Sequence, residues 1–325
     1  MVNGKAFGWA YIGAGKIAEQ TAGKIIKTGS HKIVSVYNRT FSKAEVFSKK
    51  FGAVPCSTIK EAILTEGVEG VYIATTANNH YLAAKECLEL GKAVLLEKPF
   101  TITRAEAQDL VNLAREKHVY LVEAMWTWFS PVAIQVKKWV QSNDVGKIKK
   151  IKLTYAMPIV KYAPRHTDPN LAGGALLDMG IYPIAYSYNL FGPPDKVECH
   201  GTLRGGIDLE ENVTLTYKDG MKVKAIISML NLKGIEKIII TGENGTVKCF
   251  FYHCAKRATL IRSTGKRVVF KGNGGYDNEF TKVAEEILSG QTESSYVPLQ
   301  ATLDNMSTLD ECRRQLGLIY PFEIK

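Results

Sequence analysis

Two glycines near the N-terminus are spaced as in a turn that binds phosphate. The string GAGKIA, residues 13–18, directly follows the apolar run Phe7–Ile12 and opens a helical pattern. Gly13 permits a tight turn, Gly15 lets the backbone approach a pyrophosphate, and Ala18 allows the helix to pack closely on the strand. The N-terminus of the helix then faces the phosphates. Glycine-rich turns are common, but the strand before this turn and the helix after it predict a dinucleotide site.

The residues after the next strand bear on the choice of dinucleotide. At the position where an NAD site usually has an acid for the ribose hydroxyls, the chain has Asn38-Arg39-Thr40. A carboxylate would repel a 2′-phosphate, whereas a guanidinium offers it paired donors and can stack on adenine. Arg39 therefore favours NADP, with NAD possible. The alternative is that Arg39 ends the strand in solvent, which leaves the cofactor open.

An acid, a base and a proline end another apolar strand. Glu97-Lys98-Pro99 follows Ala93–Leu96 and could be a charged loop in water. Ligands of open α/β sheets bind at the carboxyl ends of the strands, however, and this triplet lies at that edge. The Lys98-Pro99 bond is a candidate for the cis form. The candidate cofactor contacts along this edge are Gly13, Gly15, Lys16, Ile17, Asn38, Arg39, Thr75, Asn78, His80, Glu97 and Lys98.

Two further side chains with acid/base chemistry lie in GGALLDMGIYP, residues 173–183. If this segment is helical, Asp178 and Tyr182 are four residues apart and share a face. Tyr186 continues that face, so a packed aromatic stripe is the structural alternative. Asp178 interrupts an otherwise apolar run, and a buried acid needs a partner.

The first 122 residues alternate between strand and helix patterns, which predicts βαβ units with a parallel sheet and helices on both faces. Thr103 and Glu106 form a capping box at the start of one helix. Asn78 or Asn79 is expected to cap another. The strand patterns are Phe7–Ile12, Ile33–Tyr37, Gly70–Ala74, Ala93–Leu96 and Val119–Val122, and the helix patterns are Lys16–Lys27, Lys43–Phe51, Asn79–Leu90 and Arg104–Lys117.

Residues 123–325 have a different pattern, with consecutive strands separated by Gly, Asn and Asp turns. This predicts a large, mainly antiparallel open sheet. The expected fold class is therefore α/β, with a Rossmann domain at 1–122 and an α+β domain at 123–325. One face of such a sheet is left to bury, so we expect a homodimer through it. The strand patterns are 147–157, 197–203, 213–217, 222–229, 235–241, 246–251, 259–262 and 267–270, and the helix patterns are 132–141, 276–288 and 299–316.

Composition excludes several classes of protein. The net charge of +10 is spread evenly, with 16 basic and 11 acidic residues in 1–122 and 26 and 21 in the rest, so no nucleic-acid-binding domain or tail is expected. Apolar runs are too short for a membrane span. The six cysteines lack metal-ligand spacing, which predicts reduced thiols, no metal site and, without a signal peptide, a cytoplasmic location.

The three strings GAGKIA, EKP and GGALLDMGIYP, in this order and over essentially the whole chain, resemble the glucose-fructose oxidoreductase and inositol dehydrogenase (Gfo/Idh/MocA) family. The resemblance implies that Lys98, Asp178 and Tyr182 surround the reacting carbon. Many members have histidine where this chain has Tyr182. The tyrosine and the string EAMWT at 123–127 are most similar to the dimeric dihydrodiol dehydrogenase and NADP-dependent D-xylose dehydrogenase branch. Ala77 departs from the family, in which proline is common there.

The chemistry that the resemblance implies is hydride transfer between NADP and a carbinol carbon of a sugar, cyclic polyol or vicinal diol. Tyr182 is the candidate acid/base; a free phenol has a pKa near ~10. A nearby ammonium, that of Lys98, favours the phenolate. Asp178 would orient the substrate hydroxyl or keep Lys98 charged, and Glu97 would neutralise or orient the lysine.

Four residues are candidate substrate contacts, each with a structural alternative. The aromatic rings of Trp126, Trp128 and Phe129 suit the C–H faces of a sugar or diol, and packing in the core is the alternative. Arg165 reaches substrate or lies in an exposed loop, and we assign no catalytic role to His166. Other functions also remain open: a dinucleotide-binding sensor or regulator without catalysis, and an imine or biliverdin-type reductase that would not need this Lys, Asp and Tyr set.

Overall fold

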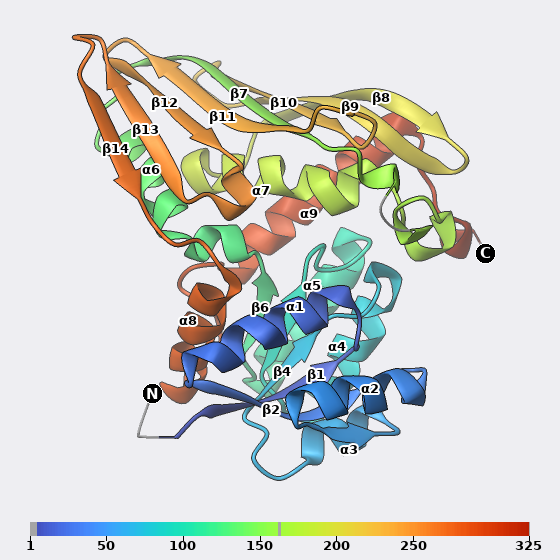
Figure 1. Ribbon diagram of the computed structural model, residues 1–325. Helices are drawn as coiled ribbons and strands as arrows, with labels where there is room; N and C mark the ends of the chain where they lie inside the picture. Colours follow the sequence, from blue (N-terminus) through green and yellow to red (C-terminus); the bar gives the residue numbers. More distant parts are fainter. Residues whose placement is uncertain (1–4, 162–163, 325) are drawn as a thin grey trace. The chain divides into compact units, whose positions relative to one another are not determined.

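The computed structural model describes residues 5–161 and 164–324, which form two compact units (Figure 1). Unit 1 comprises Met1–Met125 and Gly275–Leu303, and unit 2 comprises Trp126–Gly274 and Asp304–Lys325. The first boundary lies close to the expected one at residue 122. The inclusion of 275–303 in unit 1 differs from the expectation of two continuous domains.

Unit 1 is built on a six-stranded parallel sheet with the order β3-β2-β1-β4-β5-β6. The order reverses between β1 and β4, and ligands of open α/β sheets bind at such a reversal. Every residue of β1 is buried, as expected of a parallel strand that is covered on both faces. The strands are β1 (Phe7–Ile12), β2 (His31–Tyr37), β3 (Val54–Cys56), β4 (Gly70–Ile73), β5 (Val94–Glu97) and β6 (Leu121–Ala124).

Helices cover this sheet as the alternating pattern predicts. α1 contacts α2, whereas α4 contacts α3 and α5. The predicted capping box of α5 is present, with Thr103 and Glu106 each bonded to the other's backbone N–H. Asn79 occupies the N-cap position of α4, but its side chain makes no capping hydrogen bond, so the prediction of capping by Asn79 is wrong. The helices are α1 (Lys16–Ile25), α2 (Phe41–Phe51), α3 (Ile59–Leu64), α4 (His80–Glu89) and α5 (Arg104–Lys117).

A helix from the C-terminal part of the chain, α8 (Tyr276–Leu288), completes unit 1 and contacts α1. Its buried Phe280 packs edge-on against Trp9 of β1 and Tyr72 of β4, with ring centroids 5.0 Å apart in both pairs. The aromatic side chains of the parallel sheet thus have a partner that is remote in sequence. This packing is the physical reason why residues 275–303 belong to unit 1.

Unit 2 contains an eight-stranded sheet with the order β14-β13-β12-β11-β7-β10-β9-β8. All neighbouring pairs are antiparallel except β7 and β10, so the prediction of a mainly antiparallel open sheet is confirmed. The strands are β7 (Ile148–Ala156), β8 (Lys196–Arg204), β9 (Ile207–Thr216), β10 (Lys222–Ser228), β11 (Ile235–Gly242), β12 (Gly245–Phe250), β13 (Arg257–Arg262) and β14 (Arg267–Lys271).

One face of this sheet is covered by α6 (Pro131–Gln141) and α7 (Ile181–Phe191), together with the greater part of α9 (Leu299–Leu316) (Figure 1). Alternate residues point to that face and are buried, for example Val223, Ala225 and Ile227 on β10. This period of two is what defines a strand with one face in the core.

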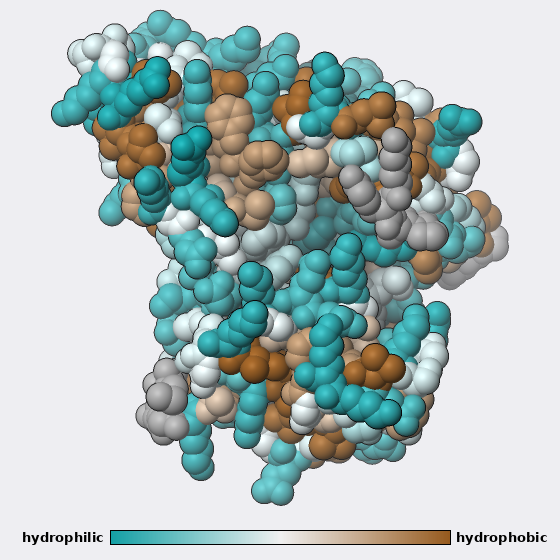
Figure 2. Space-filling model, in the orientation of Figure 1, coloured by the Kyte–Doolittle hydropathy of each residue, from teal (hydrophilic) through white to brown (hydrophobic). Residues whose placement is uncertain are grey.

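Hydrophilic side chains cover much of the face of the molecule seen in Figure 2, over both units. This distribution is consistent with the even spread of charged residues along the sequence. Within 5–161 and 164–324, no helix combines the length and the apolar character that a membrane crossing needs. The same residues contain no group of three or more His, Cys, Asp or Glu side chains that could hold a metal ion.

Candidate active site

The glycine turn between β1 and α1 leaves room for a ligand at the start of the helix. Gly13 has a φ of +107°, and a Cβ at this position would lie 2.6 Å from the carbonyl oxygen of Ala74, so a side chain does not fit there. Apart from Gly15 and its two chain neighbours, no atom of the described residues lies within 4 Å of the place where a Cβ on Gly15 would be. Gly15 is also the N-cap of α1 and provides no side-chain cap. The first turn of α1, from Lys16 onward, therefore offers uncapped N–H groups beside open space, which suits a pyrophosphate.

Asn38 and Arg39 follow β2 beside this turn. The Asn38 side chain accepts a hydrogen bond from the backbone N–H of Ala14 at 3.2 Å and donates to the Thr40 carbonyl at 3.0 Å. It thereby fastens the end of β2 to the glycine turn. The Arg39 side chain is exposed, and it makes no hydrogen bond or ion pair within the described part of the chain. The residues present thus fit a dinucleotide, with a cation available at the end of β2.

Polar residues also gather after β4. Thr76 donates through its hydroxyl to Asn78 Oδ1 at 2.7 Å, and the Asn79 amide donates to Thr76 Oγ1 at 2.8 Å. Thr75 contributes its carbonyl oxygen, which lies 3.3 Å from Nε2 of the buried His80. These bonds hold the chain between β4 and α4 in a compact turn at the ligand edge of the sheet.

His80 joins this turn to the Glu97-Lys98-Pro99 segment. Its Nδ1 lies 2.8 Å from the carbonyl oxygen of Pro99. Burial lowers the pKa of His80 to about 4, although its hydrogen bonds to the backbone carbonyls of Pro99 and Thr75 act to raise it. A neutral imidazole has one N–H, and the shorter distance assigns that donation to Pro99. Within unit 1, His80 is thus a support for the lysine-bearing turn, and its contact with a cofactor stays a prediction.

The carboxylate of Glu97 holds the turn that carries Lys98. The Lys98-Pro99 bond is cis, which confirms the prediction. Glu97 is buried, and its carboxylate accepts hydrogen bonds from the Tyr72 hydroxyl at 2.5 Å and from the Lys98 backbone N–H at 3.1 Å. The carboxylate therefore orients the backbone of the lysine, whose own side chain is half-buried.

Two further buried acids of unit 1 had no role in the sequence interpretation. Glu123, on β6, accepts a hydrogen bond from Thr302 Oγ1 at 3.0 Å, and burial raises its pKa to about 7. Burial, together with the charges of Glu97 and Glu123, raises the pKa of Glu279 well above its ordinary value. These carboxyl groups come from strands and a helix that only the fold brings together.

In unit 2, the helical segment that carries Asp178 and Tyr182 begins with a π-helical turn, Leu176–Gly180, and continues as α7. The segment is therefore helical, which is the condition that the sequence interpretation set for Asp178 and Tyr182 to share a face. We expected Asp178 and Tyr182 to share a face because residues four apart do so in an α-helix. Asp178 lies in the π turn, however, so this α-helical geometry does not apply to the pair. Such turns occur frequently at functional sites.

Asp178 has the partner that a nearly buried acid needs, and it is His166. The Asp178 Oδ2 lies 2.9 Å from His166 Nδ1, and the two side chains are 20% and 10% exposed. The glycine pair makes this approach possible, since Gly173 N–H donates to the Asp168 carbonyl and Gly174 N–H donates to the His166 carbonyl, both at 3.0 Å. Sequence reasoning gave His166 no role; the structure makes it the residue that orients Asp178.

The start of the same segment is anchored by a buried acid on β9, Asp208. Its Oδ2 accepts a hydrogen bond from the Leu176 N–H at 2.5 Å. Burial raises the pKa of Asp208, while Glu211 and the backbone N–H groups of Leu176 and Ala175 act to lower it. The neighbouring Glu211 has its pKa raised to about 11 by burial and by the charge of Asp208, so it is protonated at neutral pH. Asp208 thus fixes the N-terminal end of the helix that bears Asp178 and Tyr182.

Tyr182 is nearly buried and its hydroxyl oxygen accepts a hydrogen bond from Trp126 Nε1 at 3.0 Å. Its ring lies 5.6 Å from that of Tyr155 and 5.8 Å from that of His253. A donor aimed at a phenol oxygen favours the phenolate over the phenol. Tyr182 is therefore set in an aromatic cluster in which the Trp126 N–H contacts its hydroxyl oxygen.

The other three candidate substrate residues lie in different surroundings. Trp128 is buried and stacks on Tyr188, with ring centroids 6.0 Å apart and an interplanar angle of 15°. Phe129 is buried as well, whereas Arg165 is exposed on a short turn. Trp126 donates a hydrogen bond to Tyr182. Trp128 instead packs in the core against Tyr188, which was the structural alternative to a contact with substrate.

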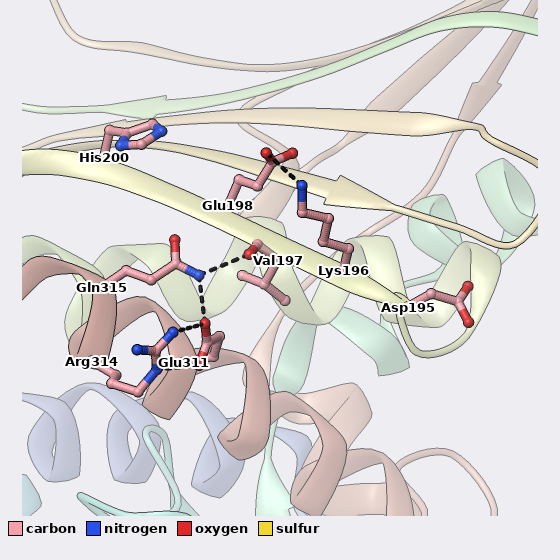
Figure 3. A pocket seen from close by; sticks show the side chains of 8 residues that line it. All are labelled: Asp195, Lys196, Val197, Glu198, His200, Glu311, Arg314 and Gln315. Atoms are coloured by element: carbon pink, nitrogen blue, oxygen red, sulfur yellow. Dashed lines mark hydrogen bonds and ion pairs between the residues drawn. The ribbon is translucent and has the colours of Figure 1, made fainter.

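A shallow groove elsewhere in unit 2 lies between the edge strand β8 and α9 (Figure 3). Four of its charged side chains form two pairs, Lys196 with Glu198 at 2.9 Å and Arg314 with Glu311 at 2.7 Å. Gln315 donates to the Val197 carbonyl at 2.8 Å. The groove contains none of the predicted site residues, and we assign it no part in catalysis.

Two family models match the chain. Residues 7–124 match an oxidoreductase family with an NAD-binding Rossmann fold, Gfo/Idh/MocA, and residues 133–248 match a Gfo/Idh/MocA C-terminal domain. The chain belongs to this oxidoreductase family. The predictions of the family, of the fold class and of an enzyme of the oxidoreductase class are thereby confirmed.

Individual relatives agree with the branch that the sequence resembled. The mouse trans-1,2-dihydrobenzene-1,2-diol dehydrogenase is 28% identical, over 97% of this chain and 98% of the mouse protein. The D-xylose 1-dehydrogenase (NADP⁺) of Hypocrea jecorina is 26% identical, over 96% and 93%. Among solved structures, a 3-ketoreductase from Actinomadura kijaniata in complex with NADP and TDP-benzene has a TM-score of 0.85 and 22% identity, over 96% and 98% of the two chains.

Proposed function

We propose that this protein is an NADP-dependent dehydrogenase that acts on the hydroxyl-bearing carbon of a sugar, cyclic polyol or vicinal diol. Tyr182 is the acid/base, assisted by Lys98 and Asp178. The observation that carries the proposal is the polar contact at the Tyr182 oxygen, which accepts the Trp126 N–H at 3.0 Å. The similarity to a diol dehydrogenase and a D-xylose dehydrogenase supports this substrate class.

In the oxidative direction, Tyr182 takes the hydroxyl proton of the substrate as its carbon loses a hydride. The nicotinamide, when bound, supplies the acceptor for that hydride. The Trp126 N–H stabilises the phenolate that must be present before the proton moves. Asp178, oriented by His166, serves as a hydrogen-bond acceptor for a substrate hydroxyl. In the reductive direction, Tyr182 returns the proton to the carbonyl oxygen.

Lys98 supplies a cation for the same reaction in this proposal. Glu97 and His80 fix the backbone on either side of it, the first through the Lys98 N–H and the second through the Pro99 carbonyl. A fixed ammonium beside a phenol lowers the phenol pKa toward the working pH. In variant structures of the related 3-ketoreductase, the replaced lysine and tyrosine are separated by the same number of residues as Lys98 and Tyr182.

NADP is preferred over NAD because of Arg39. Its exposed guanidinium follows β2, where the 2′-phosphate of the adenosine ribose would bind. A charge-assisted hydrogen bond is worth about 1.5–3 kcal/mol, so Arg39→Ala should weaken NADP binding by roughly 10- to 150-fold and NAD binding far less. Titration of both oxidised cofactors against intrinsic fluorescence tests this. Tighter binding of NAD than of NADP by the native protein would overturn the assignment.

The test of the catalytic assignment compares three variants. Lys98→Met and Tyr182→Phe should each abolish turnover while NADP still binds. Lys92→Met, just before the opposite end of β5, is the matched control and should keep normal turnover. The substrates are a panel of aldoses, cyclic polyols and vicinal diols, with reduced nicotinamide as the readout. A Lys98→Met variant with near-normal kcat would refute the role of the lysine. If the native protein forms no reduced nicotinamide with any substrate of the panel, a dinucleotide-binding sensor is favoured instead.

We also propose that the chain forms a homodimer through the sheet of unit 2. The face away from α6 and α7 carries half-buried isoleucines, Ile226, Ile239 and Ile261, on three different strands. Apolar side chains on an open sheet face favour association with a second copy. Light scattering coupled to gel filtration should give twice the chain mass, and Ile239→Glu should reduce it to one chain. A monomeric native protein would exclude this interface.

A further inference from the structure

A histidine and a glutamate that the proposed mechanism does not use lie in the same cluster as Tyr182. His253 is in a tight turn, Tyr252–Cys254, directly after β12, and Glu236 is on the neighbouring β11. Glu236 Oε1 accepts the backbone N–H of His253, and Oε2 accepts its Nδ1–H, both at 2.6 Å. Two short bonds from one fully buried carboxylate fix both the backbone and the ring of the histidine.

The ring that Glu236 fixes forms a wall of the Tyr182 cluster. It stacks on Tyr155, with centroids 5.4 Å apart and an interplanar angle of 18°. It lies 5.8 Å from the Tyr182 ring and 5.6 Å from that of Trp126, edge to face. Trp126 is also the donor to the Tyr182 oxygen, so the imidazole contacts both partners of that hydrogen bond.

The imidazole carries a positive charge at neutral pH. Burial acts to lower its pKa, but hydrogen bonds with Cys254 and Glu236 outweigh this effect and raise the pKa of His253 to about 9. The other titratable groups of this cluster are the phenols of Tyr155, Tyr182 and Tyr252, the thiol of Cys254 and, close to Tyr155, the carboxylate of Asp178. Burial keeps Tyr155 protonated, because its pKa is raised far above the ordinary value. Burial likewise raises the pKa of Tyr252 well above its ordinary value. Tyr182 is thus the remaining phenol of the cluster that can respond to the imidazolium.

We propose that His253 and Glu236 are a positioning pair for Tyr182, in which Glu236 holds a charged imidazole against the Tyr182 and Trp126 rings and so favours the phenolate. The inference rests on the proposed acid/base role of Tyr182. A purely structural role for His253 would need its shape and hydrogen bond but not its charge. His253→Gln separates the two, since the amide can still donate to Glu236 and carries no charge.

The test measures the titration of Tyr182 itself, without substrate or cofactor. In protein with ¹³C-labelled tyrosine, the Tyr182 signal is the one of the 15 that is absent from Tyr182→Phe. Loss of the nearby cation should raise the Tyr182 midpoint in His253→Gln by about 0.5–1 pH unit, a three- to tenfold change in the ionisation constant. Glu236→Gln should give a smaller shift in the same direction, because it removes the carboxylate charge along with that of the imidazole. His200→Gln, at an exposed position on β8, should give none.

Equal Tyr182 midpoints in the native protein and in His253→Gln, or no titration of Tyr182 below pH 11 in either, would overturn the proposal. Should His253→Gln fail to fold, the shift in Glu236→Gln decides, together with the midpoint of the His253 signal, which must fall below that of the native protein. If the Tyr182 midpoint shifts but the native protein turns over no substrate, the positioning pair stands and the proposed function is rejected. If the protein turns over a substrate but the midpoint does not shift, the proposed function stands and the positioning pair is rejected.

Discussion

Gly174 is the position at which one methyl group tests how the segment with Asp178 and Tyr182 is anchored. Its φ is +129°, and a Cβ there would lie 2.0 Å from Asp208 Oδ1. A side chain in such a conformation costs about 1–3 kcal/mol. Displacing Asp208 also leaves the buried Leu176 N–H without its acceptor, at a cost of about 1–3 kcal/mol. Gly174→Ala should therefore lower the free energy of unfolding by about 2–6 kcal/mol, a large part of what a typical domain has.

The measurement is urea unfolding of the full chain followed by tryptophan fluorescence. Trp126, Trp128 and Trp139 all belong to unit 2, so most of the signal reports the unit in which the change is made. The matched control is Gly192→Ala at the other end of α7. Gly192 also has a positive φ, +78°, but nothing lies within 4 Å of its Cβ position. Gly192→Ala should cost only the backbone strain, about 1–3 kcal/mol.

A double-mutant cycle separates the clash from the strain. In an Asp208→Ala background, the added methyl group meets no carboxylate, and Gly174→Ala should cost about 1–3 kcal/mol from the backbone alone. The reasoning is refuted if Gly174→Ala costs no more than Gly192→Ala. It is equally refuted if the cost is the same with and without the Asp208 side chain, because the anchor would then not involve that carboxylate.

Three other predictions concern separate parts of the molecule. Gly13→Ala should weaken dinucleotide binding at least tenfold in a fluorescence titration, since the methyl group displaces the phosphate-binding turn. Trp126→Phe should lower kcat about tenfold through loss of the hydrogen bond to the phenol of Tyr182, the proposed acid/base, whereas Trp128→Phe should leave kcat within about twofold. The folded-state pKa of His80 is lowered from 6.5 to about 4 and that of His253 is raised to about 9. In thermal unfolding scans, the contribution of His80 should therefore be lost as the pH falls from 6.5 to 4, and that of His253 as the pH rises from 6.5 to 9.

Most helices and strands of unit 1 were predicted from local patterns in the sequence, with bounds correct to within a few residues. The two elements that were not predicted, β3 and α3, show what such patterns need. β3 has three residues, one of them Pro55, and α3 has six, so neither is long enough to show a period. β3 is held by pairing with β2, and α3 is held by contact with β1, β2, β3 and α4. Short elements of this kind are specified by tertiary context, which a pattern within the chain does not contain.

The place of α8 could not be predicted for a different reason. Its bounds, Tyr276–Leu288, match the helical pattern in the sequence. A helix pattern tells which face is apolar but not which sheet that face covers. The contacts of Phe280 with Trp9 and Tyr72 join residues more than 200 positions apart, and they decide that α8 covers the sheet of unit 1.

Glu236 is a residue of the candidate site that the sequence could have revealed. On β11 it has the same parity as Ile238 and Ile240, and all three are buried. An acid on the inward side of an alternating strand is unusual, because a buried carboxylate needs a partner. The sequence interpretation applied this argument to Asp178 but not to Glu236, and so missed the histidine that pairs with it.

Some of the positions that the sequence did reveal have an unusual backbone. Gly13 and the cis proline after Lys98 place glycine or proline where other residues do not fit, and a position of this kind leaves a mark on the local sequence. The residues that hold the reactive side chains have no such mark. Neither His166 nor Asp208 has a positive φ, and their roles come from contacts that glycines and a distant strand permit. A motif therefore identifies where a reaction can occur, whereas the electrostatics that tune it depend on residues that only the fold identifies.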